Sequence, residues 1–461
     1  MNDNNENNND FTPPPTNYGQ LVKWFRQATP YINAHRHKTF VISLGGEALL
    51  DPNISNIIHD IALLNSLNTR IVIVHGCRAQ LQNKLAEKNI SSTLVEGLRV
   101  TDAATMDKVI EAASLVRSQL ETRLSMGLAP SAMHSVKVRV ASANVITAKP
   151  AGIIKGVDLQ LTGTVRNIDT LAITSLLDTG NVVLLSALGY SPSGECFNLA
   201  YNHVATEIAQ SLAADKLIAF TQSSGIHDHD GQLIRELTPA SAAQLITDQT
   251  LAPTVLPLAK AAIAAVEGGV PRAHIMSYCD DGALLQELYS VDGAGTLISQ
   301  ANFEQIRTAS ADDISAIIEM IAPLEEQGVL VRRDREKLAT EIDYFTVIER
   351  DGLIIAIAAL YPYQANQAKH HATLGEIACI VTHADYRNGN RGARLLDALE
   401  HQAQNRGIEQ VFVLTTQTAH WFIENGFNEK AVSALPEEKQ SLYNYQRNAK
   451  VLFKQLAKTV G

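Results

Sequence analysis

The turn "YRNGNRG" at residues 386–392, rich in arginine, asparagine and glycine, is the stretch that most directly suggests chemistry. It follows an apolar run typical of a strand and precedes a run typical of a helix. The free backbone N–H groups at a helix N-terminus bind a pyrophosphate well. Gly389 and Gly392 let the backbone approach a ligand, and Arg387 and Arg391 add positive charge. The pattern therefore indicates a site for a phosphate-bearing ligand, with an ordinary solvated turn as the alternative.

Length and composition limit the class of protein that carries this turn. The 461 residues exceed one ordinary core, which predicts two or three domains, and a content of 46% hydrophobic and 19% charged residues is typical of a soluble globular protein. The net charge of -10 argues against nucleic acid as the main partner. No apolar stretch reaches the length of a membrane span, so we expect a cytoplasmic protein without a membrane partner.

The cysteines and the N-terminus support the same compartment. Four cysteines without CxxC spacing predict reduced thiols rather than disulfides or zinc, and we expect no metal. Residues 1–17 are Asn-rich and then Pro-rich, with neither a basic region nor an apolar core for secretion. We expect them to form a disordered tail.

Two regions with different element patterns follow this tail. In residues 18–301 a helical segment broken at Pro30 precedes alternating strand-like and helix-like runs, which predict an α/β fold with a mostly parallel sheet covered on both faces. Within it, residues 136–149 are expected to form two paired strands. In residues 302–461 two helices lead to a hairpin that turns at Asp351-Gly352, and then to a strand, a helix, a strand and a short helix. This order predicts a compact α+β domain.

The second domain resembles the GCN5-related N-acetyltransferases. Their acetyl-CoA loop usually reads Arg/Gln-x-x-Gly-x-Gly/Ala, and the match here starts at Arg387, with Asn390 at the first glycine position. Asparagine tolerates a left-handed backbone, so the loop can keep its shape. In "VLTTQTAHWFIENGF" Phe422 occupies the slot that often holds an acid-donating tyrosine. The acetyl-CoA residues that the resemblance implies are Ile380, Val381, Arg387, Asn388, Gly389, Asn390, Arg391 and Gly392.

Acetyl transfer to an amine needs a base, because an alkylammonium with a pKa of roughly 10 must lose a proton before it attacks a thioester. Glu376, on the strand "GEIACIV", is the candidate base, and an exposed strand glutamate is the alternative. Backbone N–H groups of residues 379–381 are expected to polarise the thioester carbonyl. Thr415 is the candidate acid for the leaving thiolate.

The first domain resembles the amino-acid kinases, and among them N-acetylglutamate kinase, which implies a three-layer sandwich. The resemblance rests on "KTFVISLGGEAL", "IVIVHGCRAQL", "GLRVTD", "GVDLQLTGTVRNID" and "ELYSVDGAGTLI". The residues expected to carry phosphate transfer are replaced: Ser43 stands at the lysine position, Asn202 at the aspartate position, His75-Gly76-Cys77-Arg78 at the second glycine turn and 221–223 at the nucleotide side. Without the lysines the transferring phosphoryl group has no clamp, so we expect no kinase activity.

A regulatory site is the part of this domain expected to remain. In arginine-inhibited relatives of the resembled family, L-arginine lies between the N-terminal helix and the far end of the domain. Glu287 is suited to pair with a guanidinium, although a helix-surface glutamate beside an ordinary turn is the alternative. The residues that the resemblance implies are Tyr31, Lys216, His274, Glu287, Gly293 and Gly295.

The two domains together resemble the bacterial N-acetylglutamate synthases from about residue 21 to residue 456, through phrases such as "GALLQELYS", "VLVRRDREKL" and "LYNYQRNAKVL". The resemblance implies an enzyme of the first step of arginine biosynthesis, with acetyl-CoA as co-substrate, L-glutamate as acceptor and L-arginine as inhibitor. It also implies that the amine attacks directly within a ternary complex. A homo-oligomer is expected, and the N-terminal helix suggests a hexamer. The resemblance further implies a glutamate site formed by Leu330, Arg332, Cys379 and Arg447, with Lys439 as a weaker member.

Two other functions stay open at this level. One is an arginine-sensing regulatory protein whose two domains are both catalytically inactive. Asn390 and Phe422, which depart from the acetyltransferase pattern, support this alternative. The other is an acetylglutamate kinase with a fused modifier domain. Ser43 and Asn202, which replace the lysine and the aspartate of the kinases, argue against this alternative.

Overall fold

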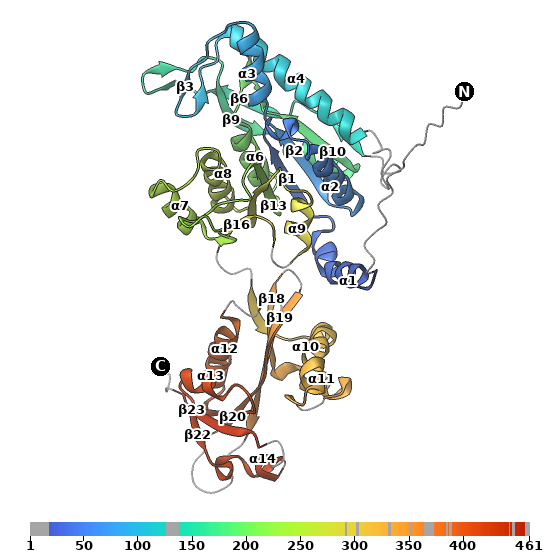
Figure 1. Ribbon diagram of the computed structural model, residues 1–461, viewed down its shortest axis with the longest axis vertical. Helices are drawn as coiled ribbons and strands as arrows, with labels where there is room; N and C mark the ends of the chain where they lie inside the picture. The colour runs from blue at the N-terminus through green and yellow to red at the C-terminus, as the bar shows by residue number, and fades with distance from the viewer. Residues whose placement is uncertain are drawn as a thin grey trace, which may run out of the picture. The chain divides into compact units, whose positions relative to one another are not determined.

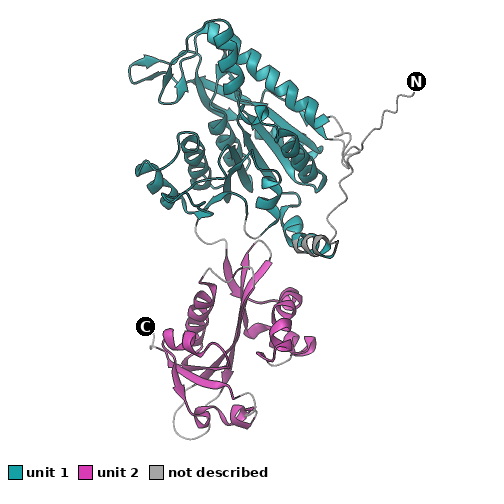
Figure 2. Cartoon of the chain, in the orientation of Figure 1, with its two compact units in different colours: residues 1–301 teal, residues 302–461 magenta. Residues whose placement is uncertain are grey.

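The chain divides into two compact units, unit 1 (Met1–Ala301) and unit 2 (Asn302–Gly461), which are coloured separately in Figure 2. The structure is a computed structural model. It describes residues 18–125, 138–290, 293–300, 304–330, 333–350, 353–363, 373–383, 386, 390–441, 443–444 and 448–456. The predicted tail of residues 1–17 lies outside these ranges.

Unit 1 is built on an eight-stranded sheet (Figure 1). Neighbouring strands are parallel except for one antiparallel pair, β15 with β16. Most of these strands are continuous apolar runs, as expected for a sheet that is covered on both faces. In sheet order the strands are β14 (Glu236–Leu237), β16 (Thr296–Ser299), β15 (Arg272–Ser277), β13 (Lys216–Thr221), β1 (Thr39–Leu44), β2 (Arg70–His75), β10 (Asn181–Ser186) and β5 (Arg139–Ala141).

Two hydrophobic cores lie on the two faces of this sheet. Successive side chains of a strand point to opposite faces, so Val41 of β1 enters one core and Phe40 and Ile42 enter the other. The first core packs against α5 (Thr170–Asp178), α6 (Tyr201–Ser211), α7 (Pro239–Thr247) and α8 (Leu256–Glu267). The second packs against α1 (Tyr18–His35), α2 (Ile54–Ser66), α4 (Ala103–Ser125) and α9 (Ala283–Tyr289). The predicted three-layer α/β sandwich is confirmed.

Smaller elements complete unit 1, and two sequence expectations are wrong. The strands expected to pair within residues 136–149 belong to different sheets: β5 adds to the large sheet, whereas β6 joins a four-stranded one. Helix α1 also continues through Pro30 instead of breaking there. The remaining elements are α3 (Arg78–Glu87), the four-stranded sheet of β12 (Cys196–Asn198), β11 (Leu188–Tyr190), β6 (Ile146–Pro150) and β9 (Gly163–Ile168), and the pairs β3 (Leu94–Val95) with β4 (Leu98–Arg99) and β7 (Ile153–Ile154) with β8 (Val157–Asp158).

Unit 2 is built on a seven-stranded sheet in which β20 and β21 are parallel and the other neighbours antiparallel. The predicted hairpin is the pair of β18 with β19, and its turn at residues 351–352 lies outside the described residues. In sheet order the strands are β17 (Gln305–Thr308), β18 (Phe345–Arg350), β19 (Leu353–Tyr363), β20 (Thr373–Thr382), β21 (Ile408–Thr415), β23 (Lys450–Gln455) and β22 (Asn428–Lys430).

Helices cover both faces of this second sheet. Phe345 and Val347 of β18 pack with α10 (Ile314–Glu326) and α11 (Arg335–Glu341). Thr346 points the other way, where its hydroxyl accepts a hydrogen bond from the amide of Gln402 on α12 (Arg391–Asn405) at 3.0 Å. The short helices α13 (Ala419–Glu424) and α14 (Glu437–Ser441) follow β21 and β22. The predicted α+β domain is confirmed.

Candidate functional site

The parallel strands β20 and β21 separate in the middle of the unit 2 sheet. Their register runs from Thr373 opposite Ile408 to Glu376 opposite Phe412. Both strands then continue, to Thr382 and Thr415, without further pairing to each other. The separation leaves a wedge in which one edge of β20 carries backbone groups that β21 does not satisfy.

A bulge shapes β20 inside this wedge. Ala359 pairs with Ala378 and Ile357 pairs with Val381, so two residues of β20, Cys379 and Ile380, stand opposite a single residue of β19. Cys379 adopts a φ of 53°, in the left-handed region that a side-chain-bearing residue seldom occupies. The bulge therefore changes the direction in which the backbone of Ile380 and Val381 faces the wedge.

Glu376 lies at the last paired position before the strands separate. Its side chain is buried, and its Oε2 atom accepts a hydrogen bond from the hydroxyl of Tyr363 at 3.1 Å. The Nζ atom of Lys439, from α14, lies 2.7 Å from the same oxygen. The alternative of an exposed strand glutamate is therefore wrong, and Lys439, predicted as a glutamate-binding residue, contacts the candidate base.

The N-terminus of α12 lies where β20 leads into the glycine-containing turn. Asn390 is the N-cap with a φ of 53°, so asparagine does hold the left-handed backbone expected of it. Gly392 faces Trp421, whose ring would be 3.4 Å from a Cβ atom at that position. Helix α12 has 15 residues and no side chain that caps its N-terminus among those described, which leaves its first N–H groups for a ligand. Arg387, Asn388 and Gly389 lie outside the described residues.

Arg391 makes contacts that its sequence position does not suggest. Its Nε atom donates to Glu304 at 2.8 Å, and its Nη1 atom donates to the carbonyl of Tyr386 at 2.7 Å. Arg394 forms an ion pair with the same carboxylate. The charge of Arg391 is therefore shared with a carboxylate rather than left wholly for a phosphate.

The far end of β21 carries the candidate acid. The Thr415 hydroxyl accepts a hydrogen bond from the backbone N–H of Thr418 at 3.0 Å, and the two hydroxyl oxygens lie 2.9 Å apart. Thr415 is half-buried at the open end of the wedge. Phe422 is buried and packs edge-on against Trp421 and Phe427, so it is a core residue of α13.

The predicted glutamate residues are only partly described. Leu330 and Cys379 pack in one hydrophobic cluster together with Tyr361, whereas Arg332 and Arg447 lie outside the described residues. Burial raises the pKa of the Cys379 thiol to about 11, although the positive charge of Arg333 opposes this effect. Cys379 is therefore a protonated thiol at neutral pH.

Three residues of this region were missed by sequence reasoning. Tyr363 contacts Glu376, and the hydroxyl of Tyr361 donates to Glu341 of α11 at 2.8 Å. The backbone N–H of Arg333 donates to Glu325 at 2.9 Å. One signal was available for the tyrosines, because two residues apart on a strand they share a face.

The residues of the predicted regulatory site gather in unit 1 between β13, β15 and α9. The Nδ1 atom of His274 lies 2.7 Å from Oε1 of Glu287, and both side chains are 5% exposed. The other oxygen, Oε2, accepts hydrogen bonds from the backbone N–H groups of Ala294 at 2.6 Å and Gly295 at 2.8 Å. Glu287 is therefore not the helix-surface residue of the alternative interpretation.

Hydrogen bonding decides the charge of this buried pair. Burial favours the neutral form of Glu287, but the hydrogen bonds from His274, Ala294 and Gly295 outweigh it and lower its pKa to about 2. Burial lowers the pKa of His274, although its hydrogen bond to Glu287 and the negative charge of that carboxylate oppose this effect. The Nε2 atom of His274 is buried and has no hydrogen-bond partner among the described residues.

The remaining residues predicted for this site lie on neighbouring elements of unit 1. Lys216 is buried on β13, with its Nζ atom 5.8 Å from the ring centroid of Phe40. Tyr31 of α1 belongs to the same hydrophobic core as Phe40. Gly293 has a φ of 63°, and a Cβ atom there would lie 2.6 Å from the Glu287 carboxylate. The structure thus brings the six predicted residues to one region.

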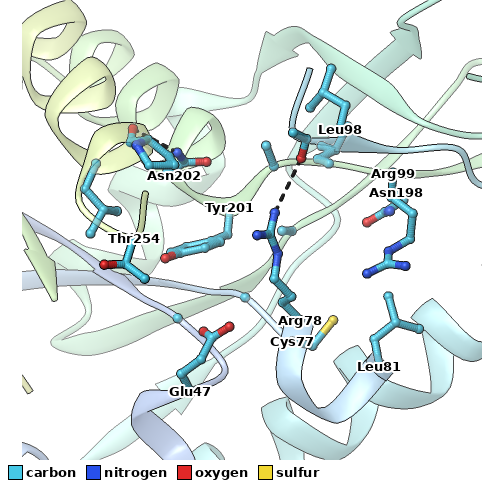
Figure 3. A pocket seen from close by; sticks show the side chains of 18 of the residues that line it. Glu47, Cys77, Arg78, Leu81, Leu98, Arg99, Asn198, Tyr201, Asn202 and Thr254 are labelled. Atoms are coloured by element: carbon cyan, nitrogen blue, oxygen red, sulfur yellow. Dashed lines mark hydrogen bonds between the residues drawn. The ribbon is translucent and has the colours of Figure 1, made fainter. Parts of the chain in front are cut away.

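A cavity of about 430 Å³ lies at the carboxyl ends of the central strands of unit 1. Figure 3 shows Arg78, Arg99 and Asn198 on one side of it and Tyr201 with Thr254 on the other. Its described lining contains two arginines and no lysine. Arg78 donates to the carbonyl of Gly97 at 3.4 Å.

The cavity differs from a phosphate-transfer centre. Ser43 is buried on β1 and its hydroxyl has no partner among the described residues. The Tyr201 ring lies across both glycine turns: a Cβ atom on Gly76 would be 2.7 Å from it, and one on Gly45 would be 3.1 Å from its hydroxyl. The amide of Asn202 donates to the carbonyl of Pro257 at 3.1 Å. A tyrosine therefore occupies the space between the two turns, and no lysine is among the described residues that line the cavity.

In the part of the chain that the structure describes, no group of three or more His, Cys, Asp or Glu side chains is arranged to hold a metal ion. None of the described helices combines the length and apolarity needed to cross a bilayer.

The fold and the wedge define a class of protein: an amino-acid-kinase-like unit joined to an N-acetyltransferase unit. Residues 38–277 match the model of the amino acid kinase family, and residues 313–427 match that of the acetyltransferase (GNAT) family. An amino-acid acetyltransferase of Pseudomonas putida (strain GB-1) is 50% identical over 436 residues, which are 94% of this chain and 99% of that protein.

Solved structures agree with this class. An N-acetylglutamate synthase from Neisseria gonorrhoeae, complexed with coenzyme A and L-arginine, is 36% identical, with a TM-score of 0.83 over 95% of this chain and 100% of that one. The same enzyme complexed with coenzyme A and N-acetyl-glutamate superposes with a TM-score of 0.60 at the same coverage. The chain belongs to the amino-acid acetyltransferase family of N-acetylglutamate synthases.

Proposed function

We propose that this enzyme transfers the acetyl group of acetyl-CoA to the α-amine of L-glutamate, giving N-acetyl-L-glutamate and coenzyme A, as the first step of arginine biosynthesis. The observation that carries the proposal is the buried carboxylate of Glu376 at the point where β20 and β21 separate. The similar structures that contain coenzyme A with N-acetyl-glutamate or L-arginine support the choice of ligands.

The proposed roles follow the movement of protons. Glu376 takes a proton from the substrate ammonium, and the freed amine attacks the thioester carbonyl. Backbone N–H groups at Ile380 and Val381, redirected by the bulge, stabilise the charge that develops on the carbonyl oxygen. The C–S bond breaks as the nitrogen loses its second proton. That proton reaches the leaving thiolate through the Thr415 hydroxyl, which gives one proton and regains one, so the threonine ends neutral. The uncapped N-terminus of α12, with residues 387–392, holds the phosphates of acetyl-CoA.

Direct attack within a ternary complex is favoured over a covalent intermediate. Cys379 is the thiol closest to the candidate base in sequence, and a pKa of about 11 keeps it protonated at neutral pH. A protonated thiol is a poor nucleophile. Incubation with acetyl-CoA alone should therefore give no burst of free coenzyme A, and a stoichiometric burst would contradict direct attack.

Glutamate carries two carboxylates, so its site needs cations. We propose that Arg332 and Arg447 bind them, beside Leu330 and Cys379. Arg332→Lys and Arg447→Lys should raise the KM for glutamate by about tenfold or more, because lysine cannot make the bidentate contacts of arginine. An unchanged KM for glutamate in both variants would remove this assignment.

The activity is tested by release of free thiol from acetyl-CoA with L-glutamate as acceptor, with the product identified by mass spectrometry. L-glutamine and L-aspartate serve as control acceptors, and the reaction should not need ATP. No thiol release with glutamate would contradict the proposed function. Glu376→Gln should lower kcat by about 10²- to 10⁴-fold, the range for loss of a general base. Unchanged activity and an unchanged pH–rate profile would instead remove Glu376 as the base.

We further propose that L-arginine bound to unit 1 inhibits the enzyme. The support is the buried group of Lys216, His274 and Glu287, in which the Glu287 carboxylate carries the negative charge that a guanidinium would pair with. Glu287→Ala should give an enzyme that is active but insensitive to L-arginine. If L-arginine inhibits that variant as strongly as the wild type, the site is wrongly assigned.

Helix α1 supports the proposal of a homohexamer, because Phe25 and Val22 on it are exposed apolar residues. Light scattering with and without L-arginine measures the assembly. A monomer under both conditions would contradict it.

A further inference from the structure

The two contacts of Glu376 converge on one of its two carboxylate oxygens. Oε2 accepts the hydrogen bond from Tyr363 at 3.1 Å and lies 2.7 Å from Nζ of Lys439. Oε1 accepts no hydrogen bond from any residue that the structure describes. The carboxylate is therefore held asymmetrically, with one oxygen occupied and the other available.

The two residues that hold Oε2 come from different elements and support each other. Tyr363 lies on β19, and its ring centroid is 5.9 Å from that of Phe412, the residue opposite Glu376 on β21. Lys439 lies on α14, with its Nζ atom 5.7 Å from the ring centroid of Tyr363. Phe412 is fully buried, so the packing fixes the ring and places its hydroxyl at Oε2.

A general base must present a lone pair in a fixed direction. The terminal torsion of a glutamate side chain is broad, so an unanchored carboxylate samples many orientations. Anchoring Oε2 to a hydroxyl and an ammonium removes this freedom. We propose that Tyr363 and Lys439 are positioning residues that hold Oε2 of Glu376, so that Oε1 takes the proton from the substrate amine. This inference rests on the proposed role of Glu376 as the base.

Lys439 then holds the candidate base, whereas the sequence predicts that it binds the substrate glutamate. A lysine that binds the substrate would mainly set the KM for glutamate. A lysine that holds the base would mainly set kcat, because it fixes the direction of the lone pair that takes the proton. The two roles therefore predict different kinetic changes.

Several titratable groups lie in contact with Glu376 or close to it. Tyr363 and Lys439 touch it directly, and Tyr361 lies opposite it on β19. Cys379 also faces this region, while Glu341 of α11 and Glu438 of α14 act on Tyr363 from further away. Lys439 is the only cation in direct contact with Glu376 among the described residues.

The test compares Tyr363→Phe and Lys439→Met with the wild-type enzyme. Tyr363→Phe should lower kcat by about tenfold, and Lys439→Met by about 10- to 100-fold, which are the losses expected for a hydrogen bond to a charged group. The KM for glutamate should stay within about twofold in both. Lys439→Arg, which keeps a cation at this position, should restore most of the loss. Lys450→Met, which removes an exposed lysine of β23, is the matched control and should change neither parameter.

Two outcomes would overturn the inference. A raised KM for glutamate with unchanged kcat in Lys439→Met would show that this lysine binds the substrate instead. A Tyr363→Phe loss that adds fully to that of Glu376→Gln would show that the tyrosine acts through another group, because residues acting through one base are not additive. Calorimetric binding of coenzyme A shows that each variant is folded. Thiol release by the wild type, and the effect of Glu376→Gln alone, test the proposed function separately.

Discussion

Replacement of Glu287 by glutamine should destabilise unit 1 in a way that depends on pH. Glutamine has nearly the shape of a protonated glutamate but cannot carry its charge. In the folded chain the carboxylate accepts hydrogen bonds from His274, Ala294 and Gly295, and its pKa falls from an ordinary 4.5 to about 2. Ionisation of this buried group is therefore linked to folding.

The magnitude follows from that linkage. A fall from 4.5 to about 2 corresponds to about 3 kcal/mol, since each pKa unit is worth about 1.4 kcal/mol. The folded pKa lies below the unfolded one, so this contribution is fully present above pH 4.5 and is lost as the pH falls towards 2. At pH 3 about half of it remains. Glu287→Gln should thus lower the free energy of unfolding by about 3 kcal/mol at pH 7, but by clearly less at pH 3.

Urea unfolding followed by far-UV circular dichroism, for both proteins at pH 7 and pH 3, measures this difference. Because the hydrogen bond and charge of Glu287 act on the pKa of His274, the difference between the two proteins reports the His274–Glu287 pair as a unit. Glu267→Gln, which changes an exposed glutamate at the end of α8, is the control and should leave the midpoint unchanged at both values. A gap between Glu287→Gln and the wild type that is equal at pH 7 and pH 3 would refute the assignment of a buried, ionised Glu287.

Three further predictions concern other parts of the molecule. Asn390→Ala should weaken coenzyme A binding several-fold in calorimetry, because the left-handed backbone costs alanine about 1 kcal/mol. Asn390→Gly should leave the binding nearly unchanged, and equal losses in both variants would contradict this reason. Arg391→Met should lower the melting temperature of unit 2, because it removes one partner of the half-buried Glu304 carboxylate. We expect a cost of about 2 kcal/mol with Arg394 still in place, and an unchanged melting temperature would show that Arg394 suffices. Millimolar ATP should leave the melting temperature of unit 1 unchanged, because Tyr201 fills the space between the glycine turns; a concentration-dependent rise would show that a nucleotide site persists.

The fold was predictable because the strands and helices of both units have local sequence patterns that are typical of these elements. The apolar runs around Phe40 and Val72 have the length and composition of buried strands, and each is followed by a helical run. The strand that carries Glu376 and the helix that starts at Arg391 were visible in the same way. Local pattern therefore gave the elements and their class.

The contacts between elements were not predictable in this way. The contact of Tyr363 with Glu376 depends on the register of β19 against β20, which includes a bulge at Cys379 that no composition signal marks. Arg391 and Glu304 are 87 positions apart in the sequence and meet only after folding. Charge pairing over such separations is set by tertiary packing, so a loop arginine was interpreted as a ligand for phosphate alone.

The separation of β20 from β21 has a consequence for the unliganded enzyme. An unpaired stretch of strand inside a sheet is an edge, and edges accept strands from other chains. The amide protons of residues 377–382 that face the wedge should exchange with solvent faster than those bonded to β19, and should slow when the wedge is filled. Bound co-substrate would then also cover the unpaired edge of β20 and keep it from pairing with strands of other chains. Enzyme stored without co-substrate should therefore aggregate sooner.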